Sequence, residues 1–549
     1  MAAGAWDYEA AAKADGAPFP YDHAEPAEEP QRGGTFVLNM ATLGSTIATW
    51  DPRVSTAGST LTPQNTVTSR LLVYKMGPGV NKYTVELAPE MARSWEQSPD
   101  GLTYTFKLAT NAKFHNKPPV NGRAFTAKDV VNTFKVYQDK ASITSNYFAE
   151  VESMSAPDDG TFVIKMKEPF PEFIVQFGAR VLPLIPVELF DNKDYPVGKT
   201  LVGTGSLMFD NIDAGGRWHF KANQEYFQGK PYADGLDYYL NTGDSAVALP
   251  AMRVGQIDMG AAISTKLDAD ALLKSNPDIR VNVSPIVFSS SGISFNLQNQ
   301  KFKDVRVRRA ISLAADRPAY IQKAFGGYGR SVSELGWPFV FDRPPTDAEL
   351  GKYFTKDVAE ANKLLAAAGQ SNLEFGMICN TPVSAGVQAM QDDLRSAGIK
   401  LTLQARPTTE YFQLWATTPP PKGVGSGPAK WPDAHQTSYN GQTATANFWF
   451  NHRIRSDSLA NHHTLEDTQI DTWAAQQKAE LNPQKRREIL RKMWDYMHDN
   501  VFRVEVPGGF PYEVYGPRVR GQHWRGPYLA FYHDQDQGAY FHKTWLAPK

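Results

Sequence analysis

The sequence predicts an α/β protein with two lobes. A chain of 549 residues exceeds what one hydrophobic core usually holds. Strand patterns dominate up to about residue 298, helices alternate with strands over 299–504, and strand patterns return after residue 505. A terminal segment that resumes the character of the first region suggests a lobe built from both chain ends. Two lobes joined by two crossings can close on each other about a hinge.

Composition narrows the possible functions. The formal net charge is −1, from 57 basic and 58 acidic residues, so the broad basic footprint of a nucleic-acid-binding protein is missing. We expect no nucleic-acid partner. The single cysteine, Cys379, lies in the apolar run "LEFGMIC", where a thiol behaves as a small buried hydrophobe. No apolar run approaches the ~20 residues that a membrane-spanning helix needs.

Residues 1–33 form a flexible, acidic and proline-rich tail in this interpretation. The stretch "KADGAPFPYDHAEPAEEPQRGG" cannot build a core, and it lacks the basic start and apolar centre of a signal peptide. Our hypothesis is that an export signal has been cut away and that the tether remains. The run "GGTFVLNMAT" at 33–42 then predicts the first strand.

The next block, about 76–199, has clear local signals. The run "LTYTFKL" at 102–108 alternates apolar and polar side chains and follows the turn sequence "SPDG". Thr126 and Asp129 form a capping-box pattern that starts a helix. The alternating run "GTFVIKM" at 160–166 predicts another strand.

Residues 200–298 are expected to be rich in strands, with "RWHFKAN", "GLDYYLN" and "SGISFNLQN" as candidates. A helix follows, with Asp304 as N-cap, and its basic run "RVRR" at 306–309 is expected on a solvated face. The order strand "LEFGMIC", helix "VQAMQDDLRSAG", strand "IKLTLQA" predicts a βαβ unit and a partly parallel sheet.

Motif searches name no catalytic residues. The sequence has no H-E-x-x-H, no P-loop and no G-x-S-x-G, so we expect no enzyme activity and no cofactor. His452, His462 and His463 could bind a transition metal, but the residues between them are polar and loop-like, which favours surface histidines and no metal site. His115 is expected to be a structural histidine.

A small set of aromatic and polar residues fits either a ligand site or an ordinary core. The stretches "AKWPDAHQTSYN" at 429–440 and "NFWF" at 447–450 combine aromatic rings with a few donors and acceptors, as ligand pockets do. The candidate ligand-binding residues are Lys430, Trp431, Asp433, Tyr439 and Trp449 from the second lobe, Asn296 near the lobe crossing, and Tyr74 from the first lobe.

Several long blocks resemble a known family. The block "LAPEMARSWEQSPDGLTYTFKLATNAKFHNKPPVNGRAFTAKDVVNTFKVY" is similar to the signature of family 5 extracellular solute-binding proteins, the receptors of peptide, oligopeptide and nickel ABC importers. The resemblance continues in "LVGTGSLMFDNI" and "FKDVRVRRAISLAADRPAYIQKAFGGYG" and covers about 34–549.

The resemblance implies a two-lobed periplasmic-binding-protein fold of the class II type, in the large cluster with an extra subdomain and a ligand cleft between the lobes. It assigns 34–75, 200–298 and 505–549 to lobe I, 76–199 to the accessory subdomain and 299–504 to lobe II, after the tail. It also implies a monomer in the periplasm or at the cell surface, tethered to the membrane, that delivers a small-molecule or peptide ligand to a cognate ABC permease.

One departure from the family pattern bears on the ligand. In peptide-binding members, a stretch written roughly W-x-A-D-Y-x-x-P supplies an aspartate for the peptide's α-amino group. The nearest match here, "GPAKWPDA", places Lys430 at the aspartate's position and Asp433 three residues on. If Lys430 faces the ligand, repulsion disfavours an ammonium, and a sugar, opine or metal chelate becomes more credible. If Asp433 points inward, a peptide or peptide-like ligand remains the expectation. An extracytoplasmic hydrolase is the competing class.

Overall fold

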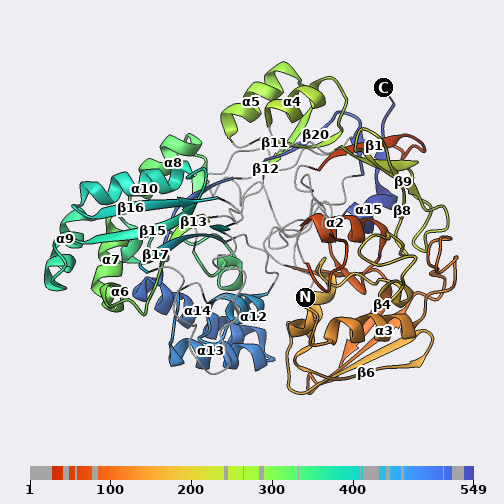
Figure 1. The fold of residues 1–549 in the computed structure, drawn as a ribbon, viewed down its shortest axis with the longest axis horizontal. Coiled ribbons are helices and arrows are strands. Elements are labelled where there is room, and N and C mark those ends of the chain that lie inside the picture. Colours follow the sequence, from red (N-terminus) through yellow and green to blue (C-terminus); the bar gives the residue numbers. More distant parts are fainter. Residues whose placement is uncertain are drawn as a thin grey trace.

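The structure is a computed structural model. It describes residues 28–40, 49–55, 58–76, 85–239, 245–263, 265–283, 290–331, 333–407, 410–411, 432–439, 445–458, 461, 463–510, 512–521 and 537–548. Two large sheets lie at opposite sides of the molecule, and a smaller sheet lies below the one on the right in Figure 1. We call the part built on the seven-stranded sheet lobe I, the part built on the five-stranded sheet lobe II, and the four-stranded sheet with α3 the accessory subdomain.

The sheet of lobe I draws on three separate parts of the chain. Its strand order is β12-β20-β11-β1-β10-β9-β8, with β1 parallel to β10 and β11 and the other pairs antiparallel. The strands are β1 (Thr35–Asn39), β8 (Leu207–Ile212), β9 (Trp218–Ala222), β10 (Gly235–Tyr239), β11 (Met259–Ile263), β12 (Arg280–Val283) and β20 (Tyr512–Tyr515). The strands expected at 33–42, "RWHFKAN" and "GLDYYLN" are therefore confirmed.

Helices also occur within 200–298, where strands were expected to dominate. The helices of lobe I are α2 (Gly58–Val67), α4 (Ser245–Arg253), α5 (Lys266–Ser275) and α15 (Gln537–Tyr540). The prediction of a strand-rich 200–298 missed α4 and α5, which contact β11 and close a core of their own against the sheet. Proline inside α4, Pro250, weakened its sequence signal.

The accessory subdomain is an antiparallel sheet covered by one long helix. Its order is β4-β5-β7-β6, and its elements are β4 (Ala92–Gln97), β5 (Thr103–Leu108), β6 (Val151–Asp158), β7 (Thr161–Met166) and α3 (Ala127–Gln138). The capping box is confirmed, because the Thr126 amide donates to the Asp129 carboxylate at 2.8 Å. His115 is a buried structural histidine, as expected. Its Nε2 lies 3.0 Å from the Gly205 carbonyl, and burial lowers its pKa to about 4.

Lobe II is a mixed sheet with helices on both faces (Figure 1). The order is β16-β15-β17-β13-β18, and β15 runs parallel to both neighbours, which confirms the βαβ prediction. Its strands are β13 (Ser290–Phe295), β15 (Glu374–Asn380), β16 (Lys400–Arg406), β17 (Ala434–Tyr439) and β18 (Arg503–Glu505). Its helices are α6 (Gln300–Lys303), α7 (Val305–Ala314), α8 (Arg317–Phe325), α9 (Val358–Ala367), α10 (Ala385–Ser396), α12 (Ala446–Trp449), α13 (Thr468–Ala479) and α14 (Pro483–Asn500).

Short elements complete the described fold. The remaining strands are β2 (Leu72–Tyr74), β3 (Leu87–Pro89), β14 (Gly329–Arg330), β19 (Gly508–Gly509), β21 (Val519–Arg520) and β22 (Trp545–Leu546). Single helical turns of other types span Ser145–Phe148, Phe173–Gly178, Val187–Leu189, Trp337–Phe339, Lys352–Phe354, Phe450–Ile454 and Phe541–Lys543.

The basic run in α7 is not entirely solvated. Arg308 is buried and donates to the carbonyls of Asn500 at 2.9 Å and Val501 at 3.1 Å. Burial lowers its pKa to about 10. The prediction of a solvated face is therefore wrong for Arg308, because the helix turns this side chain toward the end of α14, where unpaired carbonyls need donors. Cys379 is buried, as expected.

Candidate functional site

The register of the lobe II sheet shows which end of it faces lobe I. The chain passes from β12 of lobe I to β13 of lobe II, and returns from β18 to β20. Ser290, the first residue of β13, pairs with Tyr439, and Gly292 pairs with Glu505. The C-terminal ends of β17 and β18 therefore lie beside the start of β13. We call this the crossing end of the sheet; the far end lies about five residues, or ~17 Å, away.

Two of the candidate residues lie together at the far end. The Asn296 amide donates to the Asp433 carbonyl at 2.8 Å, one residue beyond the Phe295–Ala434 pair. The Asp433 carboxylate accepts from the Gly376 amide at 2.8 Å and from Asn299 at 2.9 Å, and it pairs with Lys301 at 3.3 Å. These contacts fix Asp433 within lobe II.

Two further candidates lie in hydrophobic cores. Tyr74 is 5% exposed and packs so closely on Gly178 that an added Cβ there would come within 2.8 Å of its ring. Trp449 is 4% exposed and belongs to the main core of lobe II. Both side chains pack within cores in this structure, and for Trp449 an ordinary core was the alternative to ligand contact.

The remaining candidates are Lys430, Trp431 and Tyr439. Lys430 and Trp431 lie outside the described residues. The backbone of Tyr439 ends β17 at the crossing end of the sheet, as its pairing with Ser290 shows. Among the described candidates, Tyr439 is thus the one that the register places beside the lobe crossings.

A buried ion pair that sequence analysis missed lies in the middle of the sheet, where Arg503 pairs with Ser294 and Glu505 pairs with Gly292. Arg503 and Glu505 lie 3.0 Å apart with side-chain exposures of 1% and 3%. The guanidinium also donates to the Thr437 carbonyl at 2.8 Å. A Cβ on Gly292 would lie 2.4 Å from Arg503 Nε, so glycine leaves the space that the guanidinium occupies. The available signal was two charged residues, two apart, in the otherwise apolar strand "RVEV".

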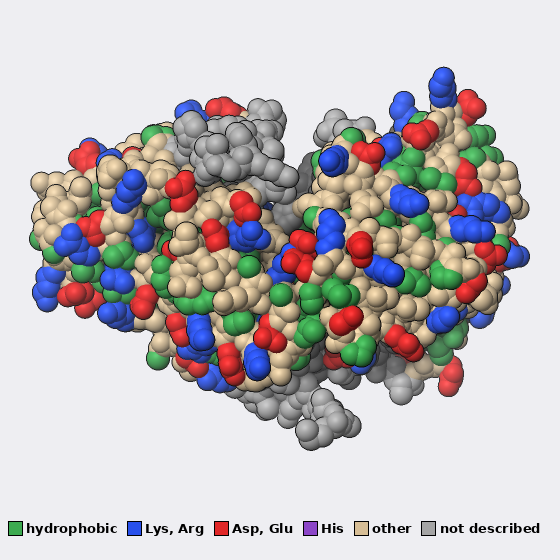
Figure 2. Space-filling model, turned by 90° about the horizontal axis from the view of Figure 1, so that it is seen from below, with side chains coloured by type: hydrophobic (Ala, Val, Ile, Leu, Met, Phe, Trp, Pro, Cys, Tyr) green, Lys and Arg blue, Asp and Glu red, His purple; other side chains and the backbone are tan. Residues whose placement is uncertain are grey.

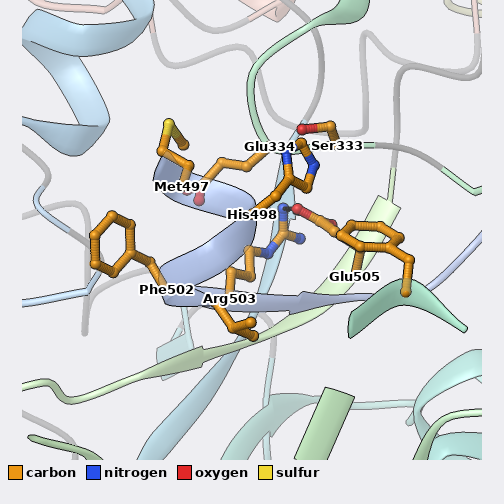
Figure 3. A pocket seen from close by; sticks show the side chains of 9 residues that line it. Ser333, Glu334, Met497, His498, Phe502, Arg503 and Glu505 are labelled. Carbon is orange, nitrogen blue, oxygen red and sulfur yellow. Dashed lines mark hydrogen bonds and ion pairs between the residues drawn. The ribbon is translucent and has the colours of Figure 1, made fainter. Parts of the chain in front are cut away.

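A pocket lies next to this ion pair. Its lining residues are Ser333, Glu334, Phe354, Met497, His498, Val501, Phe502, Arg503 and Glu505. Figure 3 shows His498, Arg503 and Glu505 gathered around its middle. Nδ1 of His498 donates to the Trp494 carbonyl at 2.8 Å, and burial lowers the pKa of His498 to about 4, so its imidazole is neutral at neutral pH.

His463 extends the same polar region and corrects one prediction. It is fully buried, and its Nε2 lies 2.5 Å from Oε1 of Glu334. The expectation of surface histidines is therefore wrong for His463, because a loop sequence gave no sign that its carbonyl accepts a hydrogen bond from the Leu297 amide, in the segment that follows β13. In the described part of the chain, no group of His, Cys, Asp and Glu residues could hold a metal ion, and no described helix is long and apolar enough to cross a membrane.

The chain is similar to known proteins in sequence and in fold. A family model described as bacterial extracellular solute-binding proteins, family 5 Middle, matches residues 86–449. A Pseudomonas aeruginosa protein named "Probable di/tripeptide-binding protein 5" is 28% identical over 368 residues. That match covers 61% of this chain and 66% of the relative, slightly under two thirds of its length.

Solved structures with a similar fold extend over almost the whole chain. Periplasmic binding protein DppA from Helicobacter pylori, in complex with peptide STSA, has a TM-score of 0.72 at 22% identity and covers 94% of this chain and 99% of its own. Binding protein AgaA from A. tumefaciens R10, in complex with agropinic acid, has a TM-score of 0.74 at 23% identity with the same coverage. The chain therefore has the two-lobed fold of periplasmic binding proteins.

Proposed function

The chain belongs to the bacterial extracellular solute-binding proteins of family 5, and we propose that it captures a solute between its lobes and delivers it to the permease of an ABC importer. The observation that carries the proposal is that both lobe crossings lie at one end of the lobe II sheet. A movement at these crossings can open and close the cleft as a hinge. The receptor acts outside the cytoplasmic membrane as a tethered monomer and performs no chemistry on its ligand.

The first candidate ligand is a peptide or a peptide-like solute. The relative named for di- and tripeptides and the neighbour solved with peptide STSA support this choice. The end of β17 at the lobe crossings would let an extended peptide form backbone hydrogen bonds as strands do. Of the candidate site residues, Tyr439 and the two residues outside the description, Lys430 and Trp431, remain those we propose for ligand contact.

A second candidate ligand lacks a free amine, as an opine, an oligosaccharide or a metal chelate does. The sequence contains no Asp or Glu between Asp433 and Asp457, so the segment that follows β17 offers amides and hydroxyls but no carboxylate for an ammonium group. Asp433 and Glu505, two described carboxylates of this sheet, are each paired with a cation. The fold neighbour solved with agropinic acid accords with this candidate.

Calorimetry with two matched probes separates the candidates. Trialanine and N-acetyl-trialanine differ only in the terminal ammonium group. If a carboxylate recognises that group, acetylation weakens binding by about 10²-fold or more, because the carboxylate loses its partner in a desolvated site. Equal binding of both probes supports amine-independent recognition. If neither trialanine nor N-acetyl-trialanine binds, and an opine or nickel chelated by histidine does bind, the second candidate ligand is supported. Release of alanine from either probe would contradict a receptor without enzyme activity.

A further inference from the structure

The accessory subdomain contacts lobe II through a carboxylate that is nearly buried. Glu172 is 9% exposed and precedes the helical turn Phe173–Gly178. Its Oε2 accepts a hydrogen bond from the Asn447 amide at 2.9 Å and its Oε1 accepts one from the Ala446 amide at 3.2 Å. Its Oε1 also pairs with the guanidinium of Arg486 on α14. One carboxylate of the subdomain is thus bonded to two separate elements of lobe II.

These contacts belong to a closed ring of hydrogen bonds. Arg486 Nε donates to Gln477 Oε1 at 3.2 Å, and Gln477 Nε2 donates to Asn447 Oδ1 at 3.1 Å. The backbone N–H of Asn447 donates to the Glu172 carboxylate, which closes the ring. The ring therefore connects α12, α13 and α14 with the subdomain. Gln477 is fully buried. Charge-assisted bonds that are shielded from water are the strong ones, and removal of Glu172 would leave Arg486 without this partner.

A second set of contacts lies beside the ring. Lys478 Nζ lies 2.5 Å from a carboxylate oxygen of both Glu150 and Glu168, while Lys478 itself is only 10% exposed. The rings of Tyr147 and Phe448 stack at a centroid distance of 5.7 Å. Figure 2, which views the molecule from the side of α13 and the subdomain, shows acidic and basic side chains intermingled where the two halves meet. The contact between subdomain and lobe II is therefore both polar and aromatic.

The position of the ring in the chain connects it to the lobe crossings. Asn447 and Ala446 begin α12, seven residues or so after Tyr439 ends β17 at the crossing end of the sheet. The two amides that Glu172 binds are therefore close in the sequence to the end of β17. The bonds to Glu172 hold the start of α12 against the subdomain.

We propose that Glu172 and Arg486, with Gln477 and Asn447, form a latch that holds the accessory subdomain against lobe II and slows release of the solute. This inference rests on the proposed function, because it assigns to the latch the control of solute release from that same cleft. Glu172 acts as a positioning residue: it holds lobe II and the segment that leads from β17, without contacting the solute. Glu150 and Glu168, whose side chains are 30% and 48% exposed, form the outer side of the contact with Lys478, so salt weakens these pairs more than the ring.

The test measures the distance between subdomain and lobe II directly, without any solute. Lys135 on α3 and Lys492 on α14 are exposed, and each is replaced by cysteine and spin-labelled; Cys379 is buried and stays unlabelled. Double electron–electron resonance then compares the unsubstituted background with Glu172→Gln, Arg486→Met and the double variant. Glu374→Gln is the matched control, because it removes the same charge from an exposed pair with Lys400 on lobe II.

The latch predicts a short, narrow distance distribution in the background protein and a shift of the open-to-closed ratio by about tenfold or more in Glu172→Gln. Arg486→Met should give a similar shift, the double variant should add little, and the control should leave the distribution unchanged. Lys478→Met should shift the ratio less, and added salt should reduce its difference from the background. Hydrogen exchange within β13 and β17 should stay unchanged in all variants, which separates a latch from a general loss of folding.

Equal distributions in the background protein and in Glu172→Gln would overturn the latch, as would a background protein that already shows the long distance. Failure of the proposed function gives a different pattern. If the distances shift as expected but no peptide, opine or chelate binds, the latch stands as a contact and the receptor role fails. If a solute binds and dissociates at the same rate from Glu172→Gln and from the background, its control of release is refuted.

Discussion

Replacement of Arg503 by methionine removes a cation that lies 3.0 Å from the Glu505 carboxylate inside lobe II. Glu505 is 2% exposed, so the variant leaves a carboxylate buried without this partner. Removal of one partner of a buried pair costs about 3–5 kcal/mol. The Thr437 carbonyl also loses the donor that reaches it at 2.8 Å. Because a factor of ten corresponds to about 1.4 kcal/mol, local opening of the sheet should increase by about 10²- to 4 × 10³-fold.

Hydrogen exchange followed by mass spectrometry is the suitable assay, because a protein with several lobes need not unfold in one step. Peptides from β13, β17 and β18 should lose protection by this factor, while peptides from β9 and β10 of lobe I keep theirs. The double variant Arg503→Met with Glu505→Gln should show at least about tenfold higher protection than Arg503→Met alone, because the uncompensated buried charge is removed. Arg395→Met, in an exposed pair with Asp392, is the control and should change nothing measurable. Protection within about threefold of the unsubstituted protein in Arg503→Met would refute this reasoning.

Four further predictions follow from individual residues. Gly292→Ala should destabilise lobe II by about 1–3 kcal/mol, because its Cβ would displace the guanidinium of Arg503; hydrogen exchange in β13 checks this, and normal protection would contradict it. His498 has a pKa of about 4 in the folded protein and ~6.5 in the unfolded chain, so the unfolded chain binds more protons between these pH values. The free energy of unfolding should therefore fall by about 2 kcal/mol from pH 6.5 to pH 4.5. His498→Gln should reduce this loss in urea titrations, and an unchanged pH dependence would argue against the role of His498. Trp449→Ala should cost about 3–5 kcal/mol of lobe II stability, as expected for a core residue, whereas a purely functional loss would show that it contacts the ligand. Trp431→Ala should weaken solute binding with little change in melting temperature; an unchanged affinity would remove it from the site.

Local patterns predicted the elements whose stability comes from their own sequence. The capping box of Thr126 and Asp129, the alternation in β5 and the βαβ order of lobe II are periodic signals, and the structure confirms them. Helix α2 shows the opposite case. Its sequence "GSTLTPQNTV" contains glycine, proline and several threonines, which are poor helix formers. Tertiary bonds stabilise it, such as Gln64 to the Trp50 carbonyl at 3.0 Å and Asn65 to the Arg180 carbonyl at 2.9 Å.

The site was less predictable, because its residues meet only through the fold. Asn296 was expected near the lobe crossing, but strand register places Asn296 and Asp433 together at the far end of the sheet. No single-strand pattern shows which end of a strand faces a neighbouring lobe. Glu172 and Arg486 are more than 300 positions apart in the sequence, and each is an ordinary charged residue in its own segment. Such pairs become visible only when the lobes are placed against each other.

Small-angle X-ray scattering with and without solute tests the central claim most directly. The solute is first identified by native mass spectrometry of protein purified without refolding. If none is found, the peptide or opine probe that binds with the higher affinity is used. If the two lobes close about the crossings between β12 and β13 and between β18 and β20, saturating solute should reduce the radius of gyration and narrow the distance distribution. Identical profiles for the free and the saturated protein would contradict capture by lobe closure.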